Sequence, residues 1–163
     1  MSDVKNIIFA GLGGQGVLKS TDILAEALFS AGYDVKKSEV HGMSQRGGSV
    51  SSEVRFGSRV NSPMVPEGEC DYLVVIDPTQ VEVNSDKVAN KNNMITPEDF
   101  DAKMLENPRS INVALLGVLA GRLSRSGVLN IPGEKWYEAI RDNFAPKLHE
   151  INIRAFDDGF NAK

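Results

Sequence analysis

The chain has 163 residues, of which 41% are hydrophobic and 25% charged, so we expect residues 1–163 to fold as one domain with its own core. The net charge of −4 argues against a dedicated nucleic-acid-binding protein. The one cysteine, Cys70, cannot support a disulfide, zinc or iron–sulfur site within the chain, and it fits a reducing cytoplasm. The first residues lack the apolar stretch of a signal peptide, and the longest apolar run, 113–120, is too short to span a bilayer, so no membrane contact is expected.

The first predicted unit is a strand, a glycine-rich loop, a helix and a second strand. Residues 4–10 are apolar and β-branched, as in a buried strand, and the loop occupies 11–16. Apolar residues recur at helical spacing over 17–31, and Gly32 ends the helix. Residues 33–40 form the second strand. This order predicts that the two strands pair in parallel through a right-handed crossover.

An antiparallel hairpin and a buried strand are expected next. Residues 49–56 alternate between apolar and polar side chains, so they predict a strand that pairs with 60–64 through a turn. Residues 72–76 are the most hydrophobic strand, which favours a central place in the sheet. Asp77 ends that strand, and a loose helix over 79–88 follows.

The second half of the chain is predominantly helical. A short strand near 94–95 leads to Thr96, a good N-cap, with a proline after it. The helix over 112–126 is apolar almost all round and is therefore buried, and Gly117 and Gly121 on it would let another backbone come close. Two more helices complete the chain, at 133–143 and from Pro146 to about residue 160.

The order of these elements predicts an α/β fold. We expect a Rossmann-like three-layer sandwich, with a mostly parallel sheet, helices on both faces and an antiparallel hairpin.

The loop after the first strand has the spacing of a dinucleotide-binding site. Gly11, Gly13 and Gly16 match G-x-G-x-x-G between a strand and a helix, where missing Cβ atoms let a phosphate approach main-chain N–H groups at a helix N-terminus. Glu39 lies at the end of the second strand, roughly where a ribose-binding acid would lie. Against this, Gln15 places a long side chain in the loop. The glycines can also serve only as tight turns.

A second glycine-rich loop, which a dinucleotide site does not need, follows Glu39. It places a hydroxyl, an amide and a guanidinium beside two glycines, and an arginine can bind a carboxylate or phosphate through two hydrogen bonds. His41 is a candidate acid–base group with no nucleophile paired to it, so a structural role is favoured, and His149 is expected on a helix surface. The two loops together give the candidate cofactor-contacting residues Gly11, Gly13, Gly14, Gln15, Gly16, Ser44, Gln45, Arg46, Gly47 and Gly48.

No other catalytic signature is present in the sequence. It has no P-loop, no Ser-His-Asp order and no cluster of metal ligands, so we expect no catalytic residue and no metal site in this chain. The chain is therefore either a nucleotide-binding enzyme with few catalytic groups or one part of a larger complex.

Two long motifs resemble one family. Residues 11–17 (GLGGQGV) and 38–49 (SEVHGMSQRGGS) are similar to the gamma subunit or domain of the 2-oxoacid:ferredoxin oxidoreductases. Residues 54–57 (VRFG), 62–63 (SP) and 66–68 (PEG) look closest to the small subunit of the indolepyruvate type, and the resemblance covers nearly the whole chain.

The resemblance implies a division of labour between subunits. Partner subunits would hold thiamine diphosphate, Mg²⁺ and the iron–sulfur clusters, and the complex would oxidatively decarboxylate a 2-oxoacid to an acyl-CoA and pass electrons to ferredoxin. This chain would hold none of these cofactors alone; its two loops would form one lip of the partner's active site and contact coenzyme A or the partner itself. Two alternatives remain open from the residues: a stand-alone NAD(P)- or FAD-binding Rossmann protein, and a pure scaffold subunit.

Overall fold

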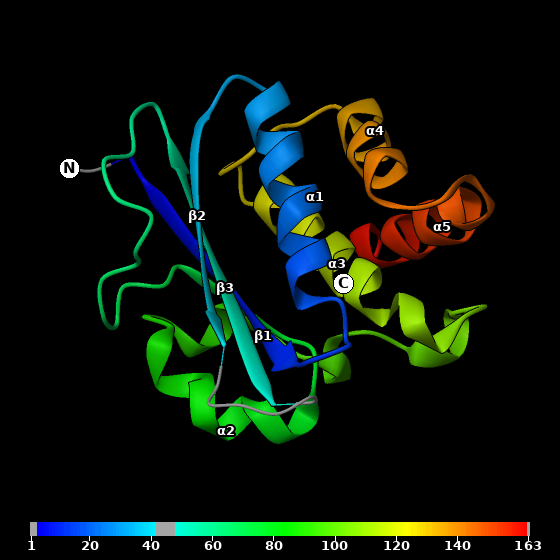
Figure 1. Cartoon of the computed structure of the whole chain (residues 1–163), viewed down its shortest axis with the longest axis horizontal. Helices are drawn as coiled ribbons and strands as arrows, with labels where there is room; N and C mark the ends of the chain where they lie inside the picture. The colour runs from blue at the N-terminus through cyan, green and yellow to red at the C-terminus, as the bar shows by residue number, and fades with distance from the viewer. Residues whose placement is uncertain (1–2, 42–47, 163) are drawn as a thin grey trace.

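The computed structural model describes residues 3–41 and 48–162 and shows a mixed sheet with helices on both faces (Figure 1). The strands are β1 (Lys5–Leu12), β2 (Asp34–His41), β3 (Ser49–Gly57), β4 (Tyr72–Val75) and β5 (Met94–Ile95). The α-helices are α1 (Val17–Ser30), α2 (Val81–Asn84), α3 (Ile111–Arg125), α4 (Gly133–Asn143) and α5 (His149–Phe160), and short 3₁₀ turns join many of these elements. The predicted α/β class is confirmed.

The sheet order is β2-β3-β1-β4-β5. β3 is antiparallel to both of its neighbours, whereas β1, β4 and β5 pair in parallel. The four strands other than β3 therefore run in one direction. β1 lies in the middle of the sheet and β4 beside it, so the 72–76 segment is an interior strand as expected.

Two predicted strand pairings are wrong. β1 and β2 do not pair, because β3 lies between them and is hydrogen-bonded to both. The predicted hairpin between residues 49–56 and 60–64 is not formed, because residues 60–64 form no strand. β3 instead pairs in antiparallel fashion with β2, the strand before it. Residues 58–64 are irregular, and the Arg55 guanidinium of β3 donates to the Ser62 carbonyl at 2.9 Å.

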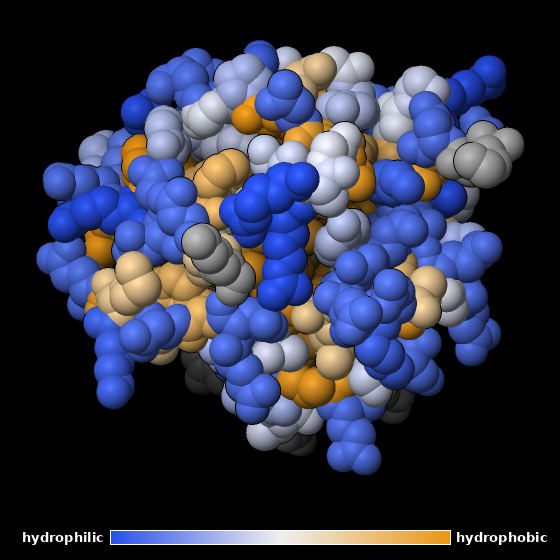
Figure 2. Space-filling model, turned by 180° about the vertical axis from the view of Figure 1, so that it is seen from behind, coloured by the Kyte–Doolittle hydropathy of each residue, from blue (hydrophilic) through white to orange (hydrophobic). Residues whose placement is uncertain are grey.

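Side chains on the two faces of the sheet enter two separate apolar clusters. Ile7, Phe9 and Val54 point towards α1 and α3 in the main core. Ile8, Leu73 and Val75 point to the other face, where Cys70 and Val88 cover them and α2 contributes Val81. Seen from behind the view of Figure 1, the surface is mostly hydrophilic, and apolar atoms show in small separate patches (Figure 2).

Helices α3 and α5 pack with their main chains in contact. A Cβ atom added to Gly117 would overlap the Phe156 carbonyl, and one added to Gly121 would overlap the Phe160 carbonyl. Gly159 of α5 makes the same close approach to the Ala114 carbonyl. The predicted close approach at Gly117 and Gly121 is therefore confirmed, and its partner is the last helix.

Cys70 is a structural residue. The thiol is fully buried, and its Sγ donates to the Tyr72 carbonyl at 2.9 Å. Burial raises the pKa of the Cys70 thiol to about 12, so it stays protonated at neutral pH. None of the helices among the described residues is long and apolar enough to cross a membrane.

Candidate functional site

The two glycine-rich loops start from adjacent ends of β1 and β3. Leu12 at the end of β1 lies opposite Ser49 at the start of β3, and the pairing continues one residue beyond the strands, where the Gly13 N–H donates to the Gly48 carbonyl at 2.8 Å. The predicted proximity of the loops therefore holds at their bases, through an antiparallel pair rather than a parallel one. The predicted residues Ser44, Gln45, Arg46 and Gly47 lie outside the described residues.

The side chain of Gln15 holds the first loop closed. Its Oε1 accepts from the Leu12 N–H at 2.7 Å, and its Nε2 donates to the Asp77 carboxylate at 2.6 Å. A Cβ atom on Gly11 would lie 2.9 Å from that Oε1, so a larger residue there would displace the Gln15 amide. Gln15 therefore serves as an internal brace as well as lining the pocket described below, whereas Gly11 is buried in β1.

Asp77 anchors this brace at the end of β4. Its other oxygen accepts from the Thr79 N–H at 2.9 Å and from the Thr79 hydroxyl at 2.5 Å, so the carboxylate also caps the first turn after the strand. The hydrogen bond from the Thr79 hydroxyl is the main cause that lowers the pKa of Asp77 below its ordinary value, with the Gln15 amide adding to it. A charged carboxylate therefore ties the loop to the sheet at neutral pH.

Gly16 fixes the start of α1 against α3. Its φ of 79° is in the left-handed region, and a Cβ atom there would overlap the Asn112 side chain. Asn112 donates from Nδ2 to the Gly16 carbonyl at 3.1 Å, and its own carbonyl accepts from the Ser20 hydroxyl at 3.3 Å. Glycine is therefore favoured at position 16 for two reasons, the left-handed backbone conformation and the close packing of Asn112.

Only part of the loop's main chain can receive a ligand. The Gly13 N–H is bound to Gly48, and the Gln15 N–H donates to the Leu12 carbonyl at 3.2 Å. Within the described part of the chain, the N–H groups of Gly14 and Gly16 have no acceptor. They lie at the N-terminus of α1, whose first turn carries no acidic residue, so the local field favours an anion.

A pocket of about 580 Å³ adjoins this end of α1. Lys19 on one wall donates from Nζ to the Asn143 carbonyl at 2.8 Å and lies 5.3 Å from the centre of the Phe144 ring. Arg109 also lines the pocket and is exposed. The lining thus combines main-chain donors, two cations and an aromatic ring, and it comes from Gly14, Gln15, Gly16, Lys19, Pro108, Arg109, Ile111, Asn112 and Phe144.

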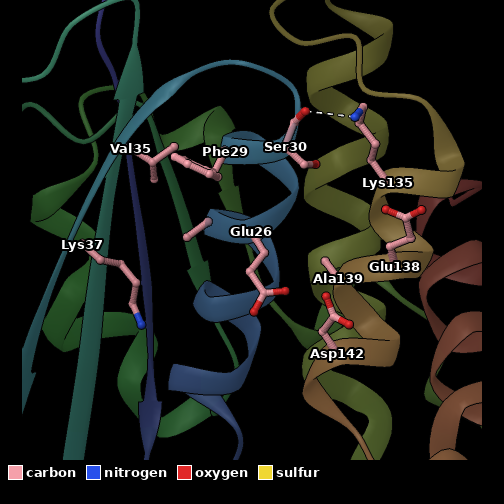
Figure 3. A pocket seen from close by; sticks show the side chains of 10 residues that line it. Glu26, Phe29, Ser30, Val35, Lys37, Lys135, Glu138, Ala139 and Asp142 are labelled. Atoms are coloured by element: carbon pink, nitrogen blue, oxygen red, sulfur yellow. Dashed lines mark hydrogen bonds between the residues drawn. The ribbon is translucent and has the colours of Figure 1, made fainter.

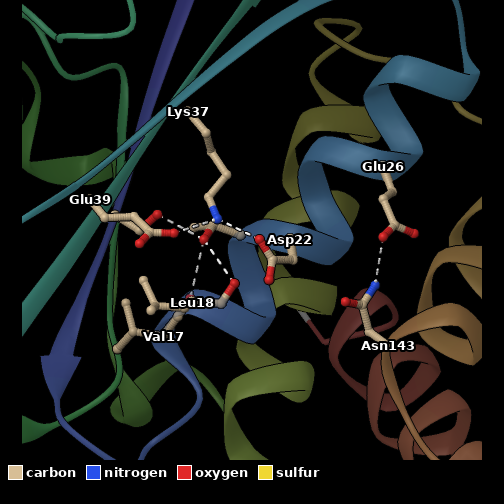
Figure 4. Close-up of polar contacts among 9 residues, drawn as sticks. Val17, Leu18, Asp22, Glu26, Lys37, Glu39 and Asn143 are labelled. Atoms are coloured by element: carbon tan, nitrogen blue, oxygen red, sulfur yellow. Dashed lines mark hydrogen bonds and ion pairs between the residues drawn. The ribbon is translucent and has the colours of Figure 1, made fainter.

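A Rossmann dinucleotide site needs the ribose-binding acid on the strand next to the one that precedes the glycine loop, and that arrangement is not formed here. Glu39 lies on β2, which β3 separates from β1 and its glycine loop. Its carboxylate pairs instead with Lys37 at 3.1 Å, and Lys37 also pairs with Asp22 of α1 at 2.5 Å (Figure 4). The predicted ribose-binding role of Glu39 therefore has no structural basis.

Comparison with known proteins gives one consistent family. Residues 6–103 and 91–162 match the pyruvate ferredoxin/flavodoxin oxidoreductase family, so the match spans almost the entire chain. The chain belongs to this family. It is 35% identical to the indolepyruvate oxidoreductase subunit IorB of Thermococcus kodakarensis, over 96% of this chain and 95% of that protein. It is 27% identical to the common gamma subunit of the pyruvate and ketoisovalerate oxidoreductases of Pyrococcus furiosus, over 93% of each.

Two solved oxidoreductase structures have the same fold. Pyruvate oxidoreductase subunit PORC of Thermotoga maritima is similar with a TM-score of 0.70 at 22% identity, over 99% of this chain and 97% of that one. The 2-oxoglutarate:ferredoxin oxidoreductase of Magnetococcus marinus, solved with 2-oxoglutarate, coenzyme A and succinyl-CoA, matches with a TM-score of 0.76 at 22% identity, over 98% of this chain and 31% of that one. The predicted kinship with gamma-type subunits is confirmed, and the alternative of a stand-alone dinucleotide enzyme is not supported.

The remaining candidate residues do not form a catalytic group. His41 is the last residue of β2, and the structure describes its main chain but not its side chain. His149 is half-buried rather than on the surface, with Nε2 2.8 Å from the Phe144 carbonyl. Among the described residues, no set of His, Cys, Asp and Glu side chains is placed to hold a metal ion.

Residues that sequence reasoning missed surround the glycine loop of this family member. Asp77 was identified only as a strand end, although the order Asp-Pro-Thr is also typical of a side-chain cap. Asn112 is a polar residue at the start of an otherwise apolar helix, which is a signal for a specific hydrogen bond. Lys19 and Arg109 carry no such signal, since they come together only in the folded chain.

Proposed function

We propose that this chain is the gamma-type subunit of a complex that oxidatively decarboxylates indolepyruvate, or a similar aryl 2-oxoacid, to an acyl-CoA and passes the electrons to ferredoxin. The choice of substrate class is supported by identity: 35% to an indolepyruvate oxidoreductase subunit against 27% to a subunit shared by pyruvate and ketoisovalerate enzymes. Residues 1–163 act as one gamma-type domain in this proposal, since the family match runs from residue 6 to residue 162.

The redox and carbanion chemistry then belongs to companion subunits. An iron–sulfur cluster needs several cysteine thiolates, and this chain has one cysteine, which is buried and protonated. Thiamine diphosphate, Mg²⁺ and the clusters are therefore assigned to the partner subunits. The free thiol also fits assembly in the reducing cytoplasm.

In the complex, the two glycine loops form one lip of the partner's active site. The N–H groups of Gly14 and Gly16, with the cations Lys19 and Arg109 that line the same pocket, suit the phosphate groups of coenzyme A. Arg46 and its neighbours in the second loop, Ser44, Gln45, Gly47 and Gly48, complete this contact or bind the partner. The observation that carries the proposal is the hydrogen bond from Gly13 to Gly48, which joins the two loops into one surface.

A reconstituted complex tests the function. The cysteine-rich, thiamine-binding partner chain is purified alone and together with this chain, and the reduction of ferredoxin is followed with indolepyruvate, pyruvate and 2-oxoglutarate, each with coenzyme A. We expect turnover only with both chains present and kcat/KM highest for indolepyruvate. Equal turnover by the partner alone would refute a necessary gamma role, and a preference for pyruvate or 2-oxoglutarate would refute the substrate class alone.

The scaffold role is the second candidate. Two of the four N–H groups expected to contact a ligand are used inside the protein, by Gly48 and Leu12, which favours a loop shaped for docking. An Arg46→Ala variant separates the two roles: an intact complex with lost turnover supports the active-site lip, whereas dissociation of the complex supports docking.

A further inference from the structure

Strand β2 is an edge strand whose outer side has no partner. It is eight residues long and pairs only with β3, so among the described residues a row of main-chain N–H and C=O groups faces away from the sheet. Figure 1 shows this strand in front of the sheet with no helix across it. Long unprotected edges are uncommon, because they invite pairing with another chain.

The side chains along β2 complement one another when two copies pair in antiparallel fashion. A two-fold axis through Ser38 places Lys37 of each copy opposite Glu39 of the other. Within one chain Lys37 already pairs with Asp22 and Glu39, so the contact joins these ion pairs into one network across the axis. The same axis also places the aliphatic part of Lys36 against Val40, which is 51% exposed in the single chain. The neighbouring two-fold registers place Lys37 opposite Lys37 or Glu39 opposite Glu39 and are disfavoured by repulsion.

A groove beside the same edge is shaped to receive a helix side chain. It has a volume of about 470 Å³, with α1 as its floor and β2 and α4 as its walls (Figure 3). Phe29 and Val35 line it, and Phe29 is 73% exposed although it is large and apolar. Burial against a second α1 would remove this apolar surface from water.

The spacing of a continued sheet leaves room for this contact. Helix α1 lies over β3 and also contacts β2 and β1 on either side of it, so the two α1 helices of a pair would be separated by roughly three strand spacings, about 14 Å. Closely packed helices are about 8–10 Å apart. The extra few ångströms can be filled by the side chains that line the groove, Phe29 and Glu26 among them, without a backbone clash.

We propose that two copies of this chain pair through their β2 strands about a two-fold axis at Ser38. The product is a continuous ten-stranded sheet in which the two α1 helices cover the groove. The inference concerns assembly and does not depend on the substrate: two gamma-type subunits, each with its own glycine loop, would join two catalytic units into one particle.

A charge exchange tests the register. The molar mass of the full chain is measured by light scattering over a concentration series, for the wild type, for Lys37→Glu and for Lys37→Glu/Glu39→Lys. We expect the wild type to dimerise, the single variant to lose the dimer because the introduced carboxylates then meet those of Asp22 and Glu39 from both copies, and the double variant to regain it. A monomeric wild type, or a double variant that folds with the wild-type circular dichroism yet stays monomeric, would overturn the proposal.

A cross-link tests the axis in the assembled complex. Ser38→Cys should form a disulfide between two copies on oxidation, because residues directly opposite in an antiparallel pair are about 5 Å apart. Lys36→Cys is the matched control, since its two copies would be separated by roughly 13 Å along the strands. The native Cys70 is buried and should not compete. Absence of the Ser38→Cys cross-link, or equal cross-linking of the control, would show that the partner subunit covers β2 or that the edge stays free, and either result refutes the pairing.

Discussion

Gln15 joins the main chain of Leu12 to the carboxylate of Asp77, through hydrogen bonds of 2.7 and 2.6 Å. The end of β1 and the end of β4 are thereby connected by one side chain, and the glycine loop between β1 and α1 is held in shape before any ligand arrives. A ligand-binding loop that is already ordered loses less entropy on binding.

The first prediction concerns this brace. Gln15→Ala leaves the Leu12 N–H without its acceptor, and we expect a loss of about 1–3 kcal/mol in the free energy of unfolding. In the complex, the KM for coenzyme A should rise more than kcat falls. Asp77→Asn is the matched control, because its amide oxygen can still accept from Gln15. Identical stability and KM in Gln15→Ala and the wild type would show that the loop needs no brace.

The second prediction concerns the pH dependence of the Asp77 anchor. Its pKa is lowered from 3.8 by the Thr79 hydroxyl, so the stability that this interaction contributes is present above pH 3.8 and is lost as the pH falls through the lower pKa of the folded state. Thr79→Ala should therefore be less stable than the wild type at neutral pH, and the difference should shrink in acid. Thermal unfolding measured from neutral to acidic pH checks this; a difference that stays constant with pH would contradict it.

The third prediction separates backbone strain from packing in the glycine loop. Gly14 and Gly16 both have a positive φ, but only Gly16 is in contact with Asn112. Gly14→Ala should cost about 1–2 kcal/mol from strain alone, and Gly16→Ala about 3 kcal/mol or more. Adding Asn112→Ala should relieve part of the cost at Gly16 and none at Gly14. Chemical denaturation of the three single and two double variants measures these values. If the losses from Gly16→Ala and Asn112→Ala were simply additive in the double variant, the contact between the two residues would be refuted.

The fourth prediction concerns the contact between α3 and α5. Gly117→Ala forces the Phe156 carbonyl away from α3, and we expect destabilisation by about 3 kcal/mol or more. Gly127→Ala, at a site with open space, should show only the smaller strain of a positive φ. Comparable losses in the two variants would contradict the close approach of the helices.

The elements of the fold could be predicted from local sequence, whereas the order of the strands could not. The alternation in residues 49–56 predicts β3, but nothing in it reveals that the strand inserts between β1 and β2. That position depends on contacts between distant segments, such as Lys5 opposite Phe56 and Asp34 opposite Gly57. The right-handed crossover rule, applied to residues 4–40, assumes that consecutive strands are neighbours in the sheet. The predicted pairing of β1 with β2 is wrong because that assumption does not hold here.

The place of the first glycine loop between a strand and a helix could be predicted from sequence, but its polar contacts could not. Glycine spacing placed the loop between a strand and a helix, because glycine is required by local backbone conformation. The role of Gln15 depends on Asp77, 62 residues away, and the position of Gly16 depends on Asn112, 96 residues away. Such pairs leave no periodic pattern in the chain.

The most direct measurement is ferredoxin reduction with indolepyruvate and coenzyme A, by the complex that contains this chain and by the same complex with Arg46→Ala. We predict that the complex stays assembled and that turnover falls by at least tenfold, because the loop contributes positive charge to the active site. An assembled complex with unchanged kcat and unchanged KM for coenzyme A would contradict the claim that this subunit forms part of the catalytic surface.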